Sequence, residues 1–298
     1  MKILITGGAG YFGSMLTKYL LNKDHKVTVY DDLSFGDSAV GPLQKNKNYY
    51  FINDTILNYK YLERVIYEND LIIHLAAIVG EDNCIRNKLN VENINCKATE
   101  FISDICSESQ RKLIFLSTCS NYGKNEFIVT EESALNPLGL YAKSKISAEK
   151  YIINNCTSSW LVLRMSTLFG VSYKTRTDIT INQFVYQHIK KKYLEIYGPE
   201  TYRPYLHLLD ASSIIHNLIN KNTFGVFYIG YDHLNYKKID IVNIINAILG
   251  KCELKYVDID DPRDYKVSFS KIEKIIDCQN NYTLEYGINE LYNHYTES

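Results

Sequence analysis

The amino-acid sequence predicts an α/β fold with a doubly wound parallel sheet, and three observations indicate it. A short apolar run at 3–5 leads into a glycine-rich turn at 7–13, and a helical pattern follows at 15–21. Apolar runs then alternate with helical patterns as far as residue 164, the order expected of one domain with right-handed crossovers. The run at 71–77 has the apolar character of a strand that helices cover on both faces.

The turn G-G-A-G-Y-F-G at 7–13 has the glycine spacing of a dinucleotide-binding unit. Gly7 lets the chain turn sharply, Gly10 lets backbone N–H groups approach a pyrophosphate, and Gly13 lets helix and strand pack closely. The N-terminus of the helix adds a partial positive charge directed at the same phosphates. These features predict a Rossmann-type fold that binds a dinucleotide.

The second expected strand, at 26–30, ends in Asp31 and Asp32. A carboxylate at this point can accept hydrogen bonds from the ribose hydroxyls of adenosine, and it would repel a 2′-phosphate. We therefore expect NAD rather than NADP as the cofactor. A carboxylate that only ends the strand in a turn is the alternative.

The remaining elements follow from their apolar patterns. We expect strands at 49–54, 71–77, 112–118, 160–164 and 194–197, helices at 61–66, 89–106 and 141–155, and a helix through 184 and 189. His74, inside its strand, is interpreted as a core histidine with satisfied hydrogen bonds.

Beyond residue 170 the alternation changes, which predicts a small, interleaved C-terminal substrate domain. The expected limits are 1–170 with about 204–235 for the NAD-binding domain, and about 171–203 with 236–298 for the substrate domain.

Composition limits the classes of partner. The 298 residues carry a net charge of −1 and a pI near 6.7, which gives no electrostatic reason to expect nucleic acid or a membrane surface. The seven cysteines are scattered, odd in number and never spaced as C-x-x-C, which indicates reduced thiols and argues against a disulfide framework or a metal site. With no signal peptide or membrane span apparent, we expect a cytoplasmic protein.

One pair of residues carries the predicted chemistry. Tyr141 and Lys145 lie four positions apart on one face of the helix expected at 141–155. A neighbouring ammonium favours the phenolate and lowers the pKa of a tyrosine, which can then accept a hydroxyl proton while hydride leaves the same carbon. Thr118, at the end of its strand, can orient that hydroxyl. A surface pair is the alternative, but the order of nucleotide turn, hydroxyl-ended strand and this helix favours a shared active site.

Six stretches together resemble one family: G-G-A-G-Y-F-G, D-D-L-S-F-G, H-L-A-A, S-T-C-S-N-Y-G, Y-A-K-S-K and L-R-M-S-T-L-F-G. The sequence is similar to extended short-chain dehydrogenases/reductases of the NAD-dependent epimerase/dehydratase family, which act on nucleotide sugars. The resemblance implies that Tyr141 and Lys145 are the catalytic pair and Thr118 the third member. It also implies a cofactor site with several parts. The pyrophosphate would lie on Gly7, Gly10, Tyr11, Phe12 and Gly13, the ribose on Asp31 and Asp32, and the adenine near Asp54 and Thr55. The nicotinamide side would be lined by Leu75, Ala76, Ala77 and Ser117, with Asn95 as a structural asparagine.

The same resemblance implies a substrate site. Asn182 corresponds to a residue that touches the diphosphate of the nucleotide sugar, and Arg203 and Arg263 correspond to arginines that bind it from two sides. Planar guanidinium groups suit a diphosphate because they make bidentate, charge-assisted contacts. Either arginine alone is more readily explained as a solvated surface residue, but the pair within these motifs favours a ligand role. Further expected substrate contacts come from three positions: Val79, Cys119 and Ser120.

Two departures from the family pattern narrow the expected reaction. Family dehydratases carry an Asp-Glu pair directly after the catalytic threonine, and this chain has Cys119 and Ser120 there, which argues against dehydration. Many family epimerases have an asparagine where this chain has Thr167. The loop at 173–182, and the A-I-V-G stretch before Cys84, resemble a bacterial subset that makes unusual surface sugars and contains epimerases and dehydrogenases.

We therefore expect NAD-dependent oxidoreduction at C4 of a UDP-, GDP- or CDP-linked sugar, with 4-epimerisation through a transient 4-keto intermediate as the leading reading. A 4-dehydrogenase or 4-ketoreductase with tightly bound NAD(H), serving surface-polysaccharide synthesis, is the alternative, since the same residues serve all three reactions. A non-catalytic dinucleotide sensor is the remaining class, because fold alone does not establish function. The resemblance also implies a homodimer through the helix after Leu89 and the helix that carries Tyr141.

Overall fold

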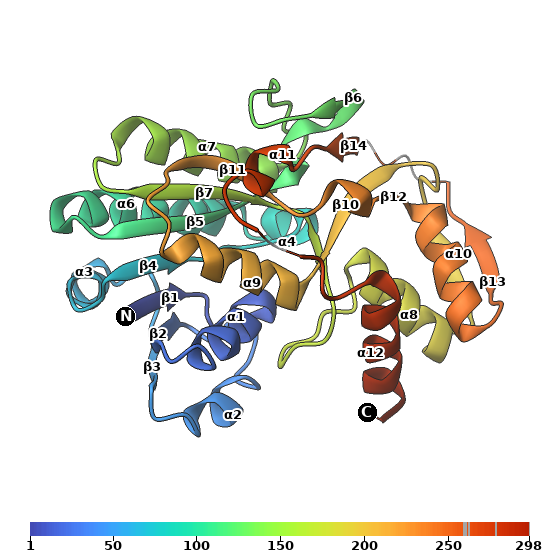
Figure 1. Cartoon of the computed structure of the whole chain (residues 1–298), viewed down its shortest axis with the longest axis horizontal. Coiled ribbons are helices and arrows are strands. Elements are labelled where there is room, and N and C mark those ends of the chain that lie inside the picture. The colour runs from blue at the N-terminus through green and yellow to red at the C-terminus, as the bar shows by residue number, and fades with distance from the viewer. Residues whose placement is uncertain (259–260, 262, 278, 298) are drawn as a thin grey trace.

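The computed structural model describes residues 1–258, 261, 263–277 and 279–297. Its centre is a seven-stranded, fully parallel sheet in the order β11-β7-β5-β4-β1-β2-β3 (Figure 1). The strands are β1 (Lys2–Thr6), β2 (Lys26–Asp31), β3 (Tyr49–Asn53), β4 (Leu71–His74), β5 (Lys112–Thr118), β7 (Trp160–Met165) and β11 (Gly225–Ile229). The strand order reverses between β1 and β4, and open α/β sheets bind their ligands at such a switch point. The predicted fold class is confirmed.

Helices cover both faces of this sheet, because successive side chains of a strand point to opposite faces. Ile3 and Ile5 of β1 lie in one buried cluster with side chains of α1 (Tyr11–Leu21) and α9 (Leu208–Ile219). Leu4 lies in a second cluster with side chains of α3, α6 and α7, whose bounds are α3 (Tyr59–Tyr67), α6 (Ala98–Ser109) and α7 (Leu140–Asn155). Both cores are apolar, and the sheet between them is covered on each side.

A second region lies to the right in Figure 1 and has a core of its own. It contains α8 (Thr180–Lys190), α10 (Lys238–Leu249) and α12 (Leu284–Glu297), with β9 (Tyr193–Ile196) paired to β13 (Glu253–Tyr256), and β10 (Tyr202–His207) between β8 (Thr167–Phe169) and β12 (Asn235–Lys237). Between these segments the chain returns to the large sheet as β11. We propose for the domains the limits predicted from the sequence.

Several short elements differ from expectation. The stretch after β2 contains α2 (Val40–Gln44), and β6 (Lys124–Val129) pairs with β14 (Asp264–Val267). Both were missed because α2 is too short to show a helical period and β6 depends on a partner far along the chain. The helix expected at 89–106 consists of three consecutive pieces, α5 (Lys88–Val91), a π-helical turn (Glu92–Lys97) and α6, and the strand expected to reach residue 77 ends at His74.

His74 is confirmed as a core histidine. It is fully buried between the hydroxyls of Thr6 and Thr99, at 2.6 and 2.9 Å, and burial lowers its pKa to about 3. Its ring is therefore neutral and occupied by structural bonds.

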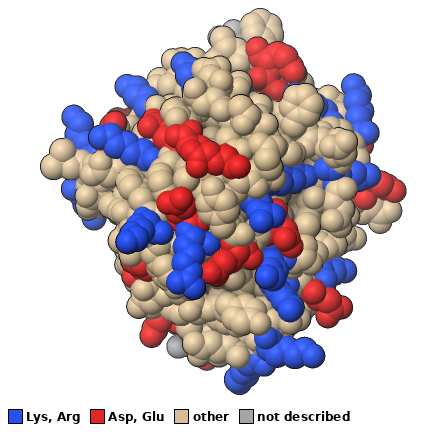
Figure 2. Space-filling model, turned by 90° about the vertical axis from the view of Figure 1, so that its left-hand side faces the viewer, with Lys and Arg blue, Asp and Glu red and all other residues tan. Residues whose placement is uncertain are grey.

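The thiols and the charged side chains bear on the expectations from composition, in the part of the chain that the structure describes. Six cysteines are free, and Cys278 lies outside the described residues. Figure 2 shows Lys and Arg interspersed with Asp and Glu over one face. Within the part of the chain that the structure describes, no helix combines the length and the apolar character needed to cross a membrane.

Candidate active site

The glycine turn lies at the carboxyl end of β1, where it brings backbone atoms unusually close together. A Cβ atom on Gly13 would lie 2.1 Å from the carbonyl oxygen of Gly7, and one on Gly7 would lie 2.7 Å from the amide nitrogen of Ala76. Gly7 also has a positive φ of 73°, a conformation that glycine adopts without strain. The turn can therefore form only with glycine at these two positions.

The turn leaves backbone donors free at the start of α1. The first intrahelical bond runs from the N–H of Ser14 to the carbonyl of Gly10, at 3.0 Å. The N–H groups of Tyr11, Phe12 and Gly13 consequently have no acceptor within the helix, and the first turn contains no acidic residue. Such a helix start is suited to a phosphate group.

The side chains of this turn have other partners than the sequence suggested. The hydroxyl of Tyr11 donates to the carbonyl of Gly170 at 2.9 Å. The ring of Phe12 is 9% exposed and belongs to the core under α1. Only their backbone atoms are positioned for the predicted pyrophosphate contact.

Asp31 ends β2 next to the glycine turn. Its two carboxylate oxygens accept from the N–H groups of Ala9 (3.0 Å) and Leu33 (2.9 Å), which fixes the carboxylate against the turn. Asp32 points elsewhere, and it accepts from the backbone and hydroxyl of Ser34. Of the two predicted ribose ligands, Asp31 is therefore the one that the turn holds in place.

The predicted adenine contacts lie at the end of the neighbouring strand. Asp54 follows β3 and accepts from the backbone of Thr55 at 2.8 Å and from the amide of Asn58 at 2.7 Å. The N–H of Asp54 bonds the carbonyl of Asp31 at 3.2 Å. The strand ends that carry Asp31 and Asp54 are thus adjacent, as the sequence predicts for one adenosine site.

The segment after β4, with Leu75, Ala76, Ala77 and Val79, runs along the same edge of the sheet. Asn95, in the π-helical turn, accepts from the N–H of Ile78 at 2.8 Å and donates to its carbonyl at 3.0 Å. It also donates to the hydroxyl of Ser144 on α7 at 3.0 Å. π-helical turns occur often at functional sites, and this one lets a single asparagine join the segment to the helix of Tyr141.

Thr118, Tyr141 and Lys145 reach this edge from β5 and α7, as expected. The hydroxyl of Thr118 accepts from the N–H of Ser120 at 3.0 Å. Lys145 is 2% exposed, with its ammonium 4.0 Å from the centre of the Phe115 ring, and burial lowers its pKa to about 7. The hydroxyl of Ser117 is buried without a hydrogen-bond partner among the described residues.

The predicted electrostatics of Tyr141 need correction. We expected Lys145 to lower the pKa of this tyrosine, but burial raises it to about 12, and the protein cation that opposes the rise is Arg176. Burial dominates because the phenolate is the charged form and loses its hydration. Arg176 belongs to the loop before α8, where it pairs with Asp178 at 2.8 and 2.5 Å. Nothing in the local sequence signals this role, since it depends on how the loop folds over α7.

Asn182, for which the sequence predicts a contact with the diphosphate, bonds other protein groups in the structure. Its side chain is fully buried. It accepts from the N–H of Gly170 at 3.1 Å and donates to the carbonyl of Arg176 at 2.9 Å and to the hydroxyl of Tyr11 at 3.2 Å. These bonds occupy the amide, so Asn182 ties the loop before α8 to the glycine turn.

The two predicted arginines do come together, around a carboxylate that the sequence reading did not assign. Asp261 has a side chain 1% exposed and lies 2.9 Å from Arg203, 3.1 Å from Arg263 and 2.6 Å from Lys238. These cations lower the pKa of Asp261 to about 2 against the effect of burial. Among these four residues the charge is +2. Lys238 is 4% exposed and Arg203 5%, whereas 44% of the Arg263 side chain is exposed.

Cys119 and Ser120 follow Thr118 in a single 3₁₀ turn (Cys119–Tyr122). Cys119 is 1% exposed, its thiol donates to the carbonyl of Arg164 at 3.3 Å, and burial raises its pKa. This thiol is neutral and enclosed, so it cannot exchange protons with a ligand.

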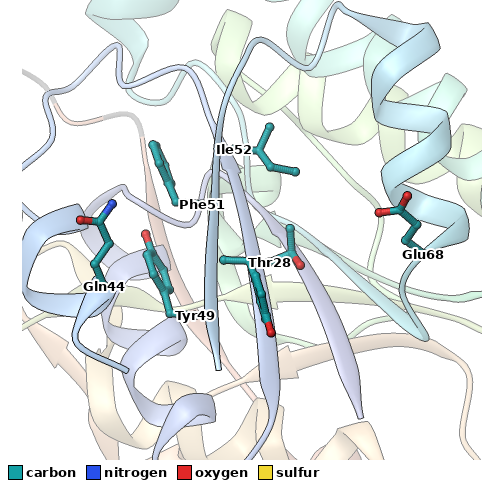
Figure 3. A pocket seen from close by; sticks show the side chains of 7 residues that line it. Thr28, Gln44, Tyr49, Phe51, Ile52 and Glu68 are labelled. Carbon is teal, nitrogen blue, oxygen red and sulfur yellow. The ribbon is translucent and has the colours of Figure 1, made fainter. Parts of the chain in front are cut away.

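A hollow of about 450 Å³ lies away from all of these residues, at the free edge of the large sheet. Figure 3 shows Gln44, Tyr49 and Phe51 on one side of β3 and Ile52 and Glu68 on the other. None of the residues that line it belongs to the predicted site.

The model of the NAD dependent epimerase/dehydratase family matches residues 3–230. The chain belongs to this family. The match spans the large sheet, the glycine turn and the segment with Thr118, Tyr141 and Lys145, and it confirms the family expected from the sequence. The glycine turn, the free N–H groups of α1 and the unpaired hydroxyl of Ser117 fit NAD, the cofactor of the family.

Curated relatives include enzymes of two reaction types. A dTDP-D-glucose 4,6-dehydratase of Dictyostelium discoideum is 30% identical over 256 residues, which are 78% of this chain and 58% of that protein. An uncharacterized UDP-glucose epimerase, YtcB, of Bacillus subtilis (strain 168) is 32% identical over 212 residues, 66% of each chain. This chain spans less than two thirds of the length of either relative.

Solved structures match over the whole chain. A UDP-glucuronic acid 4-epimerase from Bacillus cereus, in complex with UDP-glucuronic acid and NAD, is 25% identical with a TM-score of 0.89, covering 100% of this chain and 99% of that one. A dTDP-glucose 4,6-dehydratase from Bacillus anthracis, in complex with NAD, is 28% identical with a TM-score of 0.87, covering 100% and 97%.

Proposed function

We propose that this chain catalyses NAD-dependent 4-epimerisation of a nucleotide-activated sugar through a transient 4-keto sugar. The observation that carries the proposal is a hydroxyl, phenol and ammonium set at the sheet edge, Thr118, Tyr141 and Lys145, without an acid–base pair beside it. This set suits oxidation and reduction of one hydroxyl-bearing carbon. The full-length likeness to a UDP-glucuronic acid 4-epimerase supports the same reaction.

Each member of the set has a distinct task in this proposal. Tyr141 accepts the proton of the sugar hydroxyl at its phenolic oxygen and later returns it. Thr118 donates a hydrogen bond that orients that hydroxyl, and Lys145 holds the nicotinamide ribose. NAD, when bound, supplies the hydride acceptor and donor. The cofactor would be held by the free N–H groups of α1, by Asp31 and by the segment at 75–77.

The proposal excludes dehydration on the chemistry of Cys119 and Ser120. Loss of water needs an acid and a base beside the sugar, and a buried neutral thiol followed by an alcohol supplies neither near neutral pH. Under this proposal, the chain shares with the two 4,6-dehydratases its fold and its hydride chemistry, but not the loss of water.

The substrate half of the proposal rests on the cations around Asp261. One carboxylate among three cations leaves excess positive charge, and the exposed guanidinium of Arg263 is the part that a diphosphate can reach. Arg203, which is almost fully buried, would add its positive charge to the site from inside the protein. Arginine suits this task because its planar fork matches phosphate oxygens.

A homodimer is also part of the proposal, as the family resemblance implies. Leu89 on α5 is 85% exposed and Ile153 on α7 is 42% exposed, and these are the two helices expected at a dimer contact. Burial of such apolar side chains between two copies would stabilise the pair.

The test combines cofactor absorbance with product analysis. Purified protein is given UDP-, GDP- and CDP-sugars, including UDP-glucuronic acid, while absorbance at the NADH band is followed and products are identified by NMR. We expect an inverted C4 without net NADH. A released keto-sugar with stable NADH would instead indicate a dehydrogenase, and no change with any sugar would contradict the proposal.

Two tyrosines on α7 provide a matched pair of variants for this test. Tyr141→Phe removes the proposed base, and we expect turnover to fall by about a hundredfold or more. Tyr151→Phe removes a hydroxyl of the same helix, which donates to Asp104 on α6 at 2.9 Å, and we expect turnover to stay near that of the wild type. Equal turnover by both variants would contradict the assignment of Tyr141.

A further inference from the structure

The helix that carries Tyr141 begins without a cap of its own. The residue before α7 is Gly139, which has no side chain to offer a hydrogen bond. The first bond inside the helix runs from the N–H of Lys143 to the carbonyl of Gly139, at 3.0 Å. The N–H groups of Leu140 and Tyr141 therefore need acceptors from elsewhere.

Glu81, far away in the sequence, supplies both acceptors. One oxygen of its carboxylate accepts from the N–H of Leu140 at 2.6 Å, and the other accepts from the N–H of Tyr141 at 3.2 Å. Its negative charge also lies at the end of the helix that carries partial positive charge. Serine, threonine, asparagine or aspartate usually provides such a cap from within the same chain segment, so a glutamate from another helix is an unusual solution.

Backbone geometry directs Glu81 toward α7. Glu81 is the first residue of α4 (Glu81–Arg86) and follows Gly80, whose φ is +84°. That conformation favours glycine, and it turns the chain from the segment at 75–79 into α4. The carboxylate thus joins the end of this ligand-lining segment to the start of the catalytic helix.

The backbone of Tyr141 is consequently held at both its N–H and its carbonyl. Glu81 accepts from its N–H, while the hydroxyl of Ser144 donates to its carbonyl at 2.8 Å. Ser144 in turn accepts from the amide of Asn95 at 3.0 Å. The position of Asn95 follows the family pattern, whereas the hydrogen bonds to Glu81 could be found only from the structure.

We propose that Glu81 is a positioning residue for Tyr141: by capping α7 from outside, it holds the phenol where proton transfer needs it. The consequence for turnover rests on the function proposed above. The cap itself does not, and it can be tested without a sugar.

Position 139 offers a way to test whether α7 needs only a cap or the negative charge of Glu81. A Cβ atom on Gly139 would lie 2.0 Å from a carboxylate oxygen of Glu81, so a larger residue and the carboxylate exclude each other. The backbone of Gly139 is extended, with φ −104° and ψ 169°, which is the conformation of a serine cap. Serine at 139 should therefore displace the flexible end of Glu81 and supply a cap in its place.

The experiment uses Glu81→Ala, Gly139→Ser, the double variant and Asp82→Ala in the full chain. Asp82 is the next residue, exposed and in the same first turn of α4, so its removal controls for loss of one negative charge. The sugar-free readouts are hydrogen exchange at the amides of Leu140 and Tyr141 and the dissociation constant for NAD. Turnover is measured with a sugar that the wild type accepts.

We expect Glu81→Ala to exchange about fivefold faster at both amides, the factor that corresponds to loss of one cap. We expect its kcat to fall about tenfold with KM nearly unchanged, because a small displacement of a reacting group lowers the rate steeply. In the double variant the serine should restore slow exchange at Tyr141, whose N–H an N-cap side chain can reach, together with NAD affinity and most of kcat. Gly139→Ser alone should behave like the double variant, because the end of the Glu81 side chain can move aside and the serine then caps the helix.

Three results would overturn the proposal: wild-type exchange and NAD affinity in Glu81→Ala, no recovery in the double variant, or an equal loss in Asp82→Ala. If the wild type accepts no sugar, the proposed function fails, while exchange and NAD affinity still decide whether Glu81 positions this helix.

Discussion

The glycine turn and the cation cluster around Asp261 are the two parts of the candidate site that would hold phosphates, and they are held in opposite ways. In the turn, close contacts between backbone atoms set the shape, as the 2.1 Å approach of a Cβ on Gly13 to Gly7 shows. In the cluster, side chains from β10, α10 and the segment before β14 meet at one buried carboxylate. Backbone geometry is visible in a short motif, but a cluster assembled from distant residues is not.

The largest expected effect breaks the turn. In Gly13→Ala, the new methyl group would meet the carbonyl of Gly7 and the Cα of Gly8, at 2.1 and 2.8 Å. Backbone atoms cannot yield as a side chain can, so we expect the free energy of unfolding to fall by about 3 kcal/mol and NAD binding to be lost. Urea unfolding and NAD titration measure the two effects.

Gly41 is the matched control, because a Cβ there meets nothing within 4 Å. Gly41→Ala, inside α2, should leave stability unchanged or raise it by up to about 1 kcal/mol, since alanine restricts the unfolded chain. If Gly13→Ala behaves like this control, the turn is not held by its backbone contacts.

The same difference, between local backbone geometry and side chains brought together from distant segments, decides which features the sequence could predict. The large sheet, the turn and the helix of Tyr141 depend on apolar patterns and on glycine spacing, and these were recognised. Asp261 and Lys238 were not assigned, because a carboxylate and a lysine 23 positions apart have no local pattern. The motif that contains Asn182 gives no sign that this side chain is fully buried.

The Tyr141 prediction failed for a related reason. A spacing of four residues shows that Lys145 shares a helix face with Tyr141, but it does not show how deeply both are buried. Desolvation then decides the pKa of each group. Glu81, too, was invisible in the sequence, since a helix cap from another element depends on tertiary structure.

A smaller effect is expected in the cation cluster. The pKa of Asp261 is lowered to about 2, so the folded state favours its charged form. This contribution is complete above the pKa of the unfolded carboxyl, about 3.9, and is lost as the pH falls through the folded value. Asp261→Asn should therefore cost about 2 kcal/mol at pH 7, with the difference from the wild type shrinking between about pH 4 and 2.

Urea unfolding of both proteins at pH 7, 5, 4 and 3 measures this difference. Asp258→Asn, which removes an exposed carboxylate nearby, should change stability little at any of these values. A cost for Asp261→Asn that stays constant with pH would mean that lost packing, rather than lost charge, explains it.

The smallest expected effect joins the loop before α8 to the helix that carries Tyr141. Arg176 comes from the loop before α8, yet its charge lowers the pKa of Tyr141 on the Rossmann side against the effect of burial. Without this cation the phenolate is less favoured, so Arg176→Met should move the rise of turnover with pH toward higher pH. Lys174 belongs to the same loop, but its ammonium lies beside Gly36. Lys174→Met should therefore leave the dependence of turnover on pH unchanged. Equal displacement by both variants would assign the effect to net charge. Displacement by Arg176→Met alone would show that this one side chain of the loop tunes the pKa of Tyr141.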